Sequence, residues 1–215
     1  MTHKAMRTRI LRLAFLVLPF AAGCGGAPDG PIRRELSPSV LMEIPQTRQA
    51  TGYTCGVAVL QSLLAHNGIL YRQDVLEKMV GATPERGTSP DSMIRCLHGH
   101  GIGAELVQNI DLPRLRAFID AGRPVVCFLQ AWNGDPAFDY ADGWEDGHYA
   151  VAIGYDAERV YFMDPSTLSN YAHIGNHEFL QRWHDGDGEE RFYRAGIVID
   201  NPMPVYSRDA FKPML

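Results

Sequence analysis

The chain has 215 residues, of which 46% are hydrophobic and 21% are charged, and its formal net charge is −5. This composition is typical of a globular domain with a sizeable core and argues against a disordered or low-complexity chain. An acidic protein does not attract phosphate backbones, and the basic residues form no stripe with interleaved aromatic residues. We therefore expect no nucleic-acid partner.

The first stretch is typical of a secretory signal, with four basic residues followed by a short apolar run over Leu13–Ala22. The run is too short for a membrane-spanning helix. It ends in "AAGC", which resembles the lipobox of bacterial lipoproteins. We expect residues 1–23 to be a lipoprotein signal peptide and Cys24 to be lipidated, which anchors the protein to a membrane of the bacterial cell envelope, on its periplasmic or extracellular face. An ordinary cleaved signal with an incidental cysteine is the alternative.

Residues 24–39 are rich in Gly, Pro and Ser and show no apolar period, which predicts a flexible tether. The remaining residues, 40–215, form the predicted domain. Removal of the signal takes away four basic and no acidic residues, so the formal net charge moves from −5 to −9.

Helical signals dominate the first part of the domain. Apolar spacing predicts helices over residues 55–68 and 72–81, and a third helix begins after the capping residue Ser89, with Pro90 at its first position. A fourth helix is predicted over residues 111–122, with Asp111 as its cap.

Strand signals dominate the second part. We predict strands over residues 102–109, 123–132, 147–156, 159–166 and 190–200, and an amphipathic helix over residues 176–185. Helices first and a largely antiparallel sheet afterwards indicate an α+β fold.

The stretch "QATGYTCGVAVLQSLLAHNG" places Cys55 at the start of a predicted buried helix. A helix N-terminus and a neighbouring imidazolium both stabilise a thiolate, which is the nucleophilic form of cysteine. Gly56 follows and leaves backbone space for a substrate. Cys96 and Cys127 lie in apolar contexts and are expected to be buried without a disulfide.

A nucleophilic cysteine needs a base, an orienting acceptor and donors for an oxyanion. His148 follows Gly147 at the start of one predicted strand, and Asp164 ends the next, so a hairpin makes the two side chains neighbours. The backbone N–H of Cys55 and the side-chain amide of Gln49 are the candidate oxyanion donors.

Five segments carry a family resemblance: residues 49–68, 87–106, 115–132, 147–166 and 177–183. In this order they resemble the papain-like cysteine peptidases that are similar to bacteriocin-leader (double-glycine) processing peptidases, in a stand-alone form. The resemblance implies a papain-like fold, with N-terminal helices packed on an antiparallel sheet, and a peptide or protein substrate. It also implies that Cys55 is the nucleophile, His148 the base and acid, Asp164 the orienting acceptor and Gln49 the oxyanion donor.

The sequence departs from the family pattern at two positions beside the cysteine. Thr54 stands where transporter-linked members often have Asp, and Val57 stands where Pro is frequent. The chain has no GxxxxGK[ST] phosphate loop, and no cofactor is predicted.

The stretch from Ala131 to Gly147, just before His148, is rich in aromatic and acidic residues. Such a loop beside a catalytic residue is often a lid or a substrate wall. We expect Gly147 and three aromatic residues of this loop to contact an apolar or peptide substrate: Trp132, Tyr140 and Trp144. We expect four of its acids to favour basic groups of the substrate: Asp139, Asp142, Glu145 and Asp146.

Three alternatives remain open from the sequence. His173, His177 and His184 near Asp185 and Asp187 suggest a metal site, but their spacing fits no ligand motif, so a solvated face is preferred. An amidase or an acyl or peptidyl transferase would use the same thioester chemistry. A non-catalytic binding module on a papain-like scaffold is the third alternative.

Overall fold

The computed structural model describes residues 36–131, 133, 135, 138–167, 169–188, 190–200 and 204–209. The predicted signal peptide, Cys24 and nearly all of the predicted tether lie outside the described residues, as does Trp132. Within the described residues no helix is both long enough and apolar enough to cross a membrane.

Three helices come first, as predicted: α1 (Cys55–His66), α2 (Gln73–Val80) and α3 (Pro90–Gly99). The Ser89 side chain accepts a hydrogen bond from the backbone N–H of Ser92, so the predicted cap of α3 is confirmed. The helix α4 (Leu112–Asp120) is capped in the same way by Asp111. The last helix, α5, covers Asn176–Arg182.

A seven-stranded antiparallel sheet follows the order β2-β9-β3-β4-β5-β6, with β1 paired to β4. Its strands are β1 (Val40–Leu41), β2 (Gly103–Val107), β3 (Val125–Gln130), β4 (Gly147–Tyr155), β5 (Arg159–Met163), β6 (Ala172–Gly175) and β9 (Gly196–Asp200). The α+β prediction is confirmed. The strands β1 and β6 were not predicted, because two and four residues are too few to show a clear alternation.

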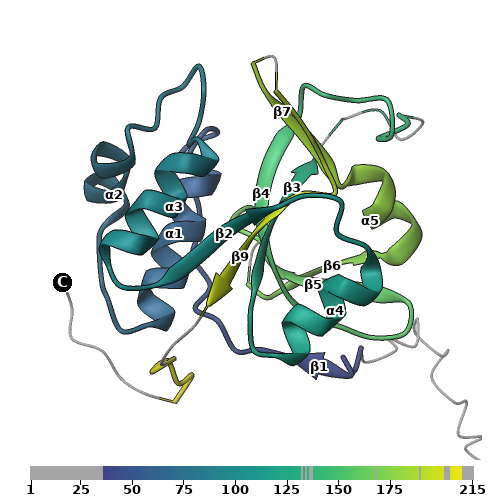
Figure 1. The fold of residues 1–215 in the computed structure, drawn as a ribbon, viewed down its shortest axis with the longest axis horizontal. Helices are drawn as coiled ribbons and strands as arrows, with labels where there is room; N and C mark the ends of the chain where they lie inside the picture. Colours follow the sequence, from purple (N-terminus) through teal and green to yellow (C-terminus); the bar gives the residue numbers. More distant parts are fainter. Residues whose placement is uncertain are drawn as a thin grey trace, which may run out of the picture. The chain divides into compact units, whose positions relative to one another are not determined.

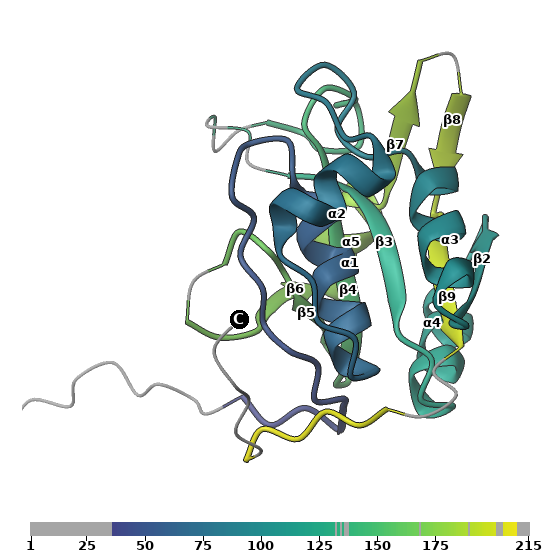
Figure 2. The same ribbon diagram turned by 90° about the vertical axis from the view of Figure 1, so that its left-hand side faces the viewer.

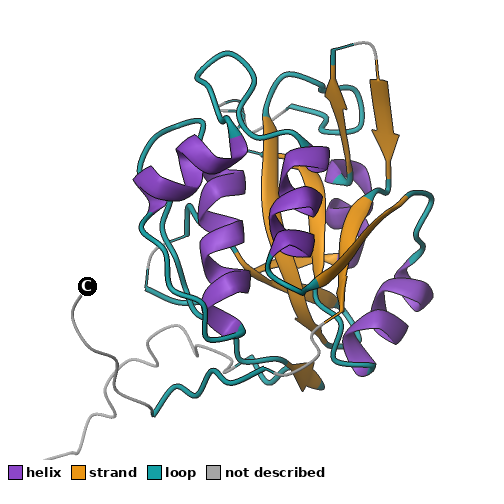
Figure 3. Cartoon of the chain, turned by 60° about the vertical axis from the view of Figure 1, so that its left-hand side comes forward, coloured by secondary structure: helices purple, strands orange, loops and turns teal. Residues whose placement is uncertain are grey.

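The central strands bury side chains on both faces. On β3, Val126 and Phe128 pack with α1, α2 and α3, whereas Val125, Cys127 and Leu129 pack with α4 and α5. The sheet therefore lies between two helical layers (Figures 1 and 3). This arrangement explains why β3 reads as a continuous apolar run rather than as an alternating one.

The prediction of one strand over residues 190–200 is wrong, because this segment forms two strands. Arg194 has a positive φ of 44° and breaks the extended chain after β8 (Glu190–Tyr193). The predicted helix over 176–185 also ends early, at Arg182, and His184–Asp187 forms β7. Together β7 and β8 form a separate two-stranded hairpin that projects beyond the main sheet (Figure 2).

Candidate active site

Cys55 is the first residue of α1, and its side chain is 9% exposed. The turn before it is held by Thr54, whose hydroxyl oxygen accepts a hydrogen bond of 2.9 Å from the backbone N–H of Thr51. Most of α1 is buried among the other helices and the sheet, so the helix is a rigid support. The thiol therefore has a fixed place at the positive end of a helix dipole.

His148 and Asp164 are hydrogen-bonded to each other. The register pairs Val151 with Met163, so Asp164, one residue further, lies diagonal to His148 on the same face. The distance from His148 Nε2 to Asp164 Oδ1 is 2.8 Å, and the two side chains are 3% and 11% exposed. The predicted proximity of these two residues is confirmed.

The Cys55 thiol also lies close enough to the His148 ring to affect its charge. Because Nε2 is bonded to Asp164, the ring nitrogen that remains for the thiol is Nδ1. Burial lowers the pKa of His148, but the interactions with Asp164 and Cys55 outweigh burial and raise this pKa above its ordinary value. The surroundings of the ring thus favour the imidazolium form.

Asp164 is held in its ionised form. Burial alone would raise its pKa, but the hydrogen bonds from His148, from the Thr167 hydroxyl and from the backbone N–H of Ser166 lower it below the ordinary value. Thr167 donates at 2.6 Å to Oδ2 and Ser166 at 3.0 Å to Oδ1. These donors fix the carboxylate against the imidazole ring.

Gln49 lies beside the segment that follows Asp164. Its backbone N–H donates to the carbonyl of Pro165 at 3.0 Å, and its side-chain Oε1 accepts from the Ser166 hydroxyl at 2.7 Å. Its Nε2 donates to the carbonyl of Thr51 at 2.8 Å, which uses one of the two N–H bonds of the amide. The chain thus brings Gln49, Asp164 and the loop before Cys55 together.

The two glycines predicted as substrate contacts both have close packing partners, and Gly147 also lines the cleft at Cys55. A Cβ at Gly56 would lie 2.8 Å from Thr88 Cβ, so Thr88 packs against this glycine. A Cβ at Gly147 would lie 2.7 Å from an oxygen of Asp185. Neither Thr88 nor Asp185 was predicted to lie near Cys55, because both come from segments distant in sequence from it.

The aromatic residues of the loop before β4 separate in the structure. Trp144 packs against His184 of β7, with ring centroids 4.5 Å apart, and lines the cleft at Cys55. Tyr140 stacks under the guanidinium of Arg182 and lines a different cavity. Of the four acids of this loop that were predicted to favour basic groups, Glu145 lines the cleft at Cys55.

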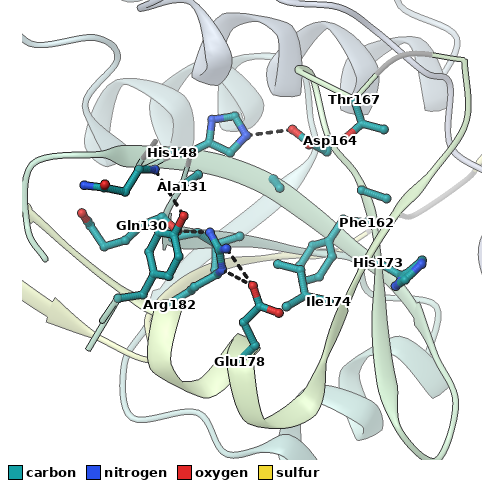
Figure 4. A pocket seen from close by; sticks show the side chains of 15 residues that line it. Gln130, Ala131, His148, Phe162, Asp164, Thr167, His173, Ile174, Glu178 and Arg182 are labelled. Carbon is teal, nitrogen blue, oxygen red and sulfur yellow. Dashed lines mark hydrogen bonds and ion pairs between the residues drawn. The ribbon is translucent and has the colours of Figure 1, made fainter. Parts of the chain in front are cut away.

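Cys55 lines one hollow and His148 lines another. The cleft onto which Cys55 opens has a volume of about 750 Å³ and lies between the loop of residues 84–88 and the β7–β8 hairpin. The second hollow, a cavity of about 340 Å³, has His148 and Asp164 along one edge and the Arg182–Glu178 ion pair across from them (Figure 4).

Within the described residues, no group of three or more His, Cys, Asp or Glu side chains is placed to hold a metal ion. The cysteines Cys55, Cys96 and Cys127 are free and buried, as the sequence predicted for the last two.

Comparisons with known proteins agree with this arrangement. A family model described as the Peptidase_C39 like family matches residues 41–188. Among solved structures, a putative C39-like peptidase from Bacillus anthracis has a TM-score of 0.58 at 19% identity, covering 75% of this chain and 97% of that one. No curated protein matches the chain.

Two further structures are peptidase domains of transporters. The peptidase domain of Streptococcus ComA, a bi-functional ABC transporter, has a TM-score of 0.53 at 17% identity, covering 71% of this chain and 95% of that one. A double glycine motif protease from an AMS/PCAT transporter, solved with a leader peptide, has a TM-score of 0.52 at 13% identity, covering 75% and 94%. At these identities the likeness shows a shared fold.

Proposed function

This chain belongs to the Peptidase_C39 like family, and on that premise we propose that it is an exported, lipid-anchored cysteine peptidase that cleaves a peptide bond through Cys55, His148 and Asp164. The observation that carries the proposal is the place of the His148 ring, which is hydrogen-bonded to Asp164 and interacts with the Cys55 thiol at the head of α1. This is the order of nucleophile, base and orienting acceptor that acyl transfer requires.

The geometry supports a two-step reaction. The Cys55 thiolate attacks the substrate carbonyl, and the oxyanion that forms is met by the backbone N–H of Cys55 and by the free N–H of the Gln49 amide. The His148 imidazolium gives its proton to the leaving amine, and an acyl-enzyme remains. His148 then takes a proton from the water that hydrolyses the thioester, while Asp164 keeps the ring in place.

Hydrolysis of a peptide mixture tests this proposal. The purified protein is incubated with a peptide library, and new N-termini are identified by mass spectrometry. We expect cleavage by the wild type and by Cys96→Ala, which removes another free, buried thiol, and none by Cys55→Ala. Equal cleavage by Cys55→Ala would contradict the assignment of the nucleophile.

The same reaction run with an added amine separates hydrolysis from transfer. A peptidase yields free carboxyl products, whereas a transferase yields amide products in which the amine has replaced water as acceptor. We expect carboxyl products, because the proposed reaction ends with water.

The anchoring part of the proposal rests on the sequence of residues 1–39, which combines a basic and apolar signal with a small-residue stretch before Cys24. A lipid on Cys24 and a tether of residues 24–39 would keep the peptidase domain close to a membrane surface in the bacterial cell envelope. The substrate is then a peptide or protein that reaches that surface.

A further inference from the structure

The cleft at Cys55 is built from parts of the chain that are far apart in sequence. One wall is the loop of residues 84–88, between α2 and α3, and the other is the β7–β8 hairpin; both stand at the same end of the sheet (Figures 1 and 2). Trp144 and Glu145, which precede β4, also line it. Whatever binds in this cleft lies directly against the Cys55 side chain.

The Thr88 side chain in this cleft has a polar atom without a partner. Thr88 is 3% exposed, and within the described part of the chain its Oγ1 makes no hydrogen bond. It lies against Gly56, the residue after Cys55, because a Cβ built on Gly56 would come within 3.0 Å of Oγ1. A buried hydroxyl without a partner is costly, and a rotation of the Thr88 side chain toward the cleft would let a ligand satisfy it.

The charges that line the cleft are mostly negative. Four carboxylates line it: Glu85, Glu145, Asp185 and Asp187. None of the four forms an ion pair with another described residue. Of the two nearby arginines, Arg86 also lines the cleft and Arg191 stacks over the Trp144 ring, 4.8 Å from its centroid.

Asp185 is the carboxylate whose position is best fixed. Its Oδ1 accepts hydrogen bonds from Gln130 Nε2 at 3.1 Å and from the backbone N–H of Gly186 at 2.8 Å. Burial raises the pKa of Asp185 to about 6, although these donors and the nearby His148 lower it. Above that pH Asp185 adds a partly buried negative charge to the cleft, and it forms no ion pair within the described residues.

We propose that this cleft is the subsite for a cationic peptide segment, in which a Lys or Arg side chain beside the scissile bond meets the four carboxylates and the Thr88 hydroxyl bonds to the substrate backbone. This inference rests on the proposed function, since the cleft is a subsite only if Cys55 is the nucleophile. It specifies the substrate class that the peptidase accepts. Charge complementarity of this kind both orients a substrate and speeds its encounter with the enzyme.

Alkylation of Cys55 by charged probes tests the proposal without a known substrate. The full chain is treated at pH 7.5 with iodoacetamide and, separately, with an iodoacetamide that carries an ethylammonium group. Each alkylation rate is divided by the rate at which the same probe alkylates glutathione, which corrects for the probe's own reactivity. We expect the cationic probe to be favoured by about tenfold. Added salt should weaken this preference, because it screens the charges of the open cleft.

Matched variants locate the source of the preference. Asp185→Asn should lower the ratio of the cationic-probe rate to the neutral-probe rate by about threefold or more, and so should the double variant Glu145→Gln with Asp187→Asn. Glu43→Gln removes an exposed charge that does not line the cleft and should keep the wild-type ratio. Equal rates of the two probes in the wild type would overturn the cationic subsite and leave the nucleophile intact, whereas a Cys55 that reacts with neither probe would overturn the proposed function itself.

Thr88 is tested with a peptidyl probe. A lysyl chloromethyl ketone with two backbone amides is compared with iodoacetamide as an alkylator of Cys55. Thr88→Val has nearly the same shape but no hydroxyl, and we expect it to lower the ratio of the ketone rate to the iodoacetamide rate by about fivefold. Thr88→Ser keeps the hydroxyl and should keep the wild-type ratio. If Thr88→Val also keeps the wild-type ratio, Thr88 serves packing alone and the proposed backbone contact is wrong.

Discussion

At the scale of the residue, two opposing effects set the pKa of His148. Burial favours a neutral ring, while the bonded carboxylate of Asp164 and the thiol of Cys55 favour a charged one, and the second effect prevails. Asp164 in turn stays ionised because three groups donate to it. The state that these interactions favour is an imidazolium held between two acceptors, which is the state that a thiolate nucleophile requires.

The pH dependence of stability tests this pair. The pKa of Asp164 is lowered from 3.8, so its contribution is present above pH 3.8 and is lost as the pH falls through the lower folded-state value. The pKa of His148 is raised from 6.5, so its contribution is complete below pH 6.5 and is lost as the pH rises through the higher folded-state value. Both contributions are therefore present between these two pH values.

Asp164→Asn should accordingly lower the free energy of unfolding by about 1–2 kcal/mol at pH 5.5 and by less at pH 3 and pH 9. Its peptidase activity should fall by about 10²–10⁴-fold, since the ring loses its orienting charge. Urea unfolding at the three pH values measures the stability. A loss of unfolding free energy that is equal at the three pH values would show that Asp164 and His148 do not titrate as a pair.

Of the candidate site residues, those whose places follow from strand pairing were predictable. His148 begins one strand of a hairpin and Asp164 follows the other, so the period of the sheet brings them together. Thr88 and Asp185 were not predictable as neighbours of Cys55, because a loop and a separate hairpin bring them there. No local pattern in the sequence encodes such a contact.

At the scale of the element, the β7–β8 hairpin is held to the strand that carries His148. Gln130, which is 1% exposed, donates from Nε2 to Asp185 and accepts at Oε1 from the backbone N–H of Asp146. Asp185 lies against Gly147, the residue before His148. The hairpin was missed in the sequence because its strands are four residues long and because Arg194 interrupts what reads as one strand.

Gly147→Ala tests the contact between hairpin and strand. The added methyl group would lie 2.7 Å from an Asp185 oxygen, so the Asp185 side chain, the hairpin or the strand must move. We expect a loss of about 1–3 kcal/mol in the free energy of unfolding and a slower alkylation of Cys55.

Gly175→Ala is the matched control, because a Cβ there meets no atom within 4 Å and its φ of −62° suits any residue. It should change neither quantity measurably. If Gly147→Ala behaved like this control, the hairpin would not constrain the position of His148.

At the scale of the whole molecule, the layered fold was predictable and its details were not. Apolar periods predicted five helices and a sheet, and the fully buried β3 indicated a covered central strand. The strand order and the contribution of β1 depend on long-range pairing, which a single sequence does not show. The cleft exists because this pairing places the hairpin across from the loop of residues 84–88.

The proposed anchor makes a prediction for the whole protein in a bacterial host. A wild-type chain lipidated at Cys24 should sediment with membranes and partition into detergent, because several acyl chains together anchor a protein stably. Cys24→Ala should appear in the soluble fraction, and Cys96→Ala should remain with the membranes. A Cys24→Ala protein that stays with the membranes at the wild-type level would contradict lipid anchoring through this residue.

The most direct test of the central claim is the rate of Cys55 alkylation by iodoacetamide as a function of pH, in the wild type and in His148→Ala. Because the pKa of His148 is raised, its imidazolium persists above pH 6.5 and can stabilise a thiolate at neutral and mildly acidic pH. We predict that the wild type reacts readily at pH 6, whereas His148→Ala reacts only as the pH approaches 8 or more. Identical pH profiles for the two proteins would contradict the thiolate–imidazolium pair, and with it the proposal that this protein is a cysteine peptidase.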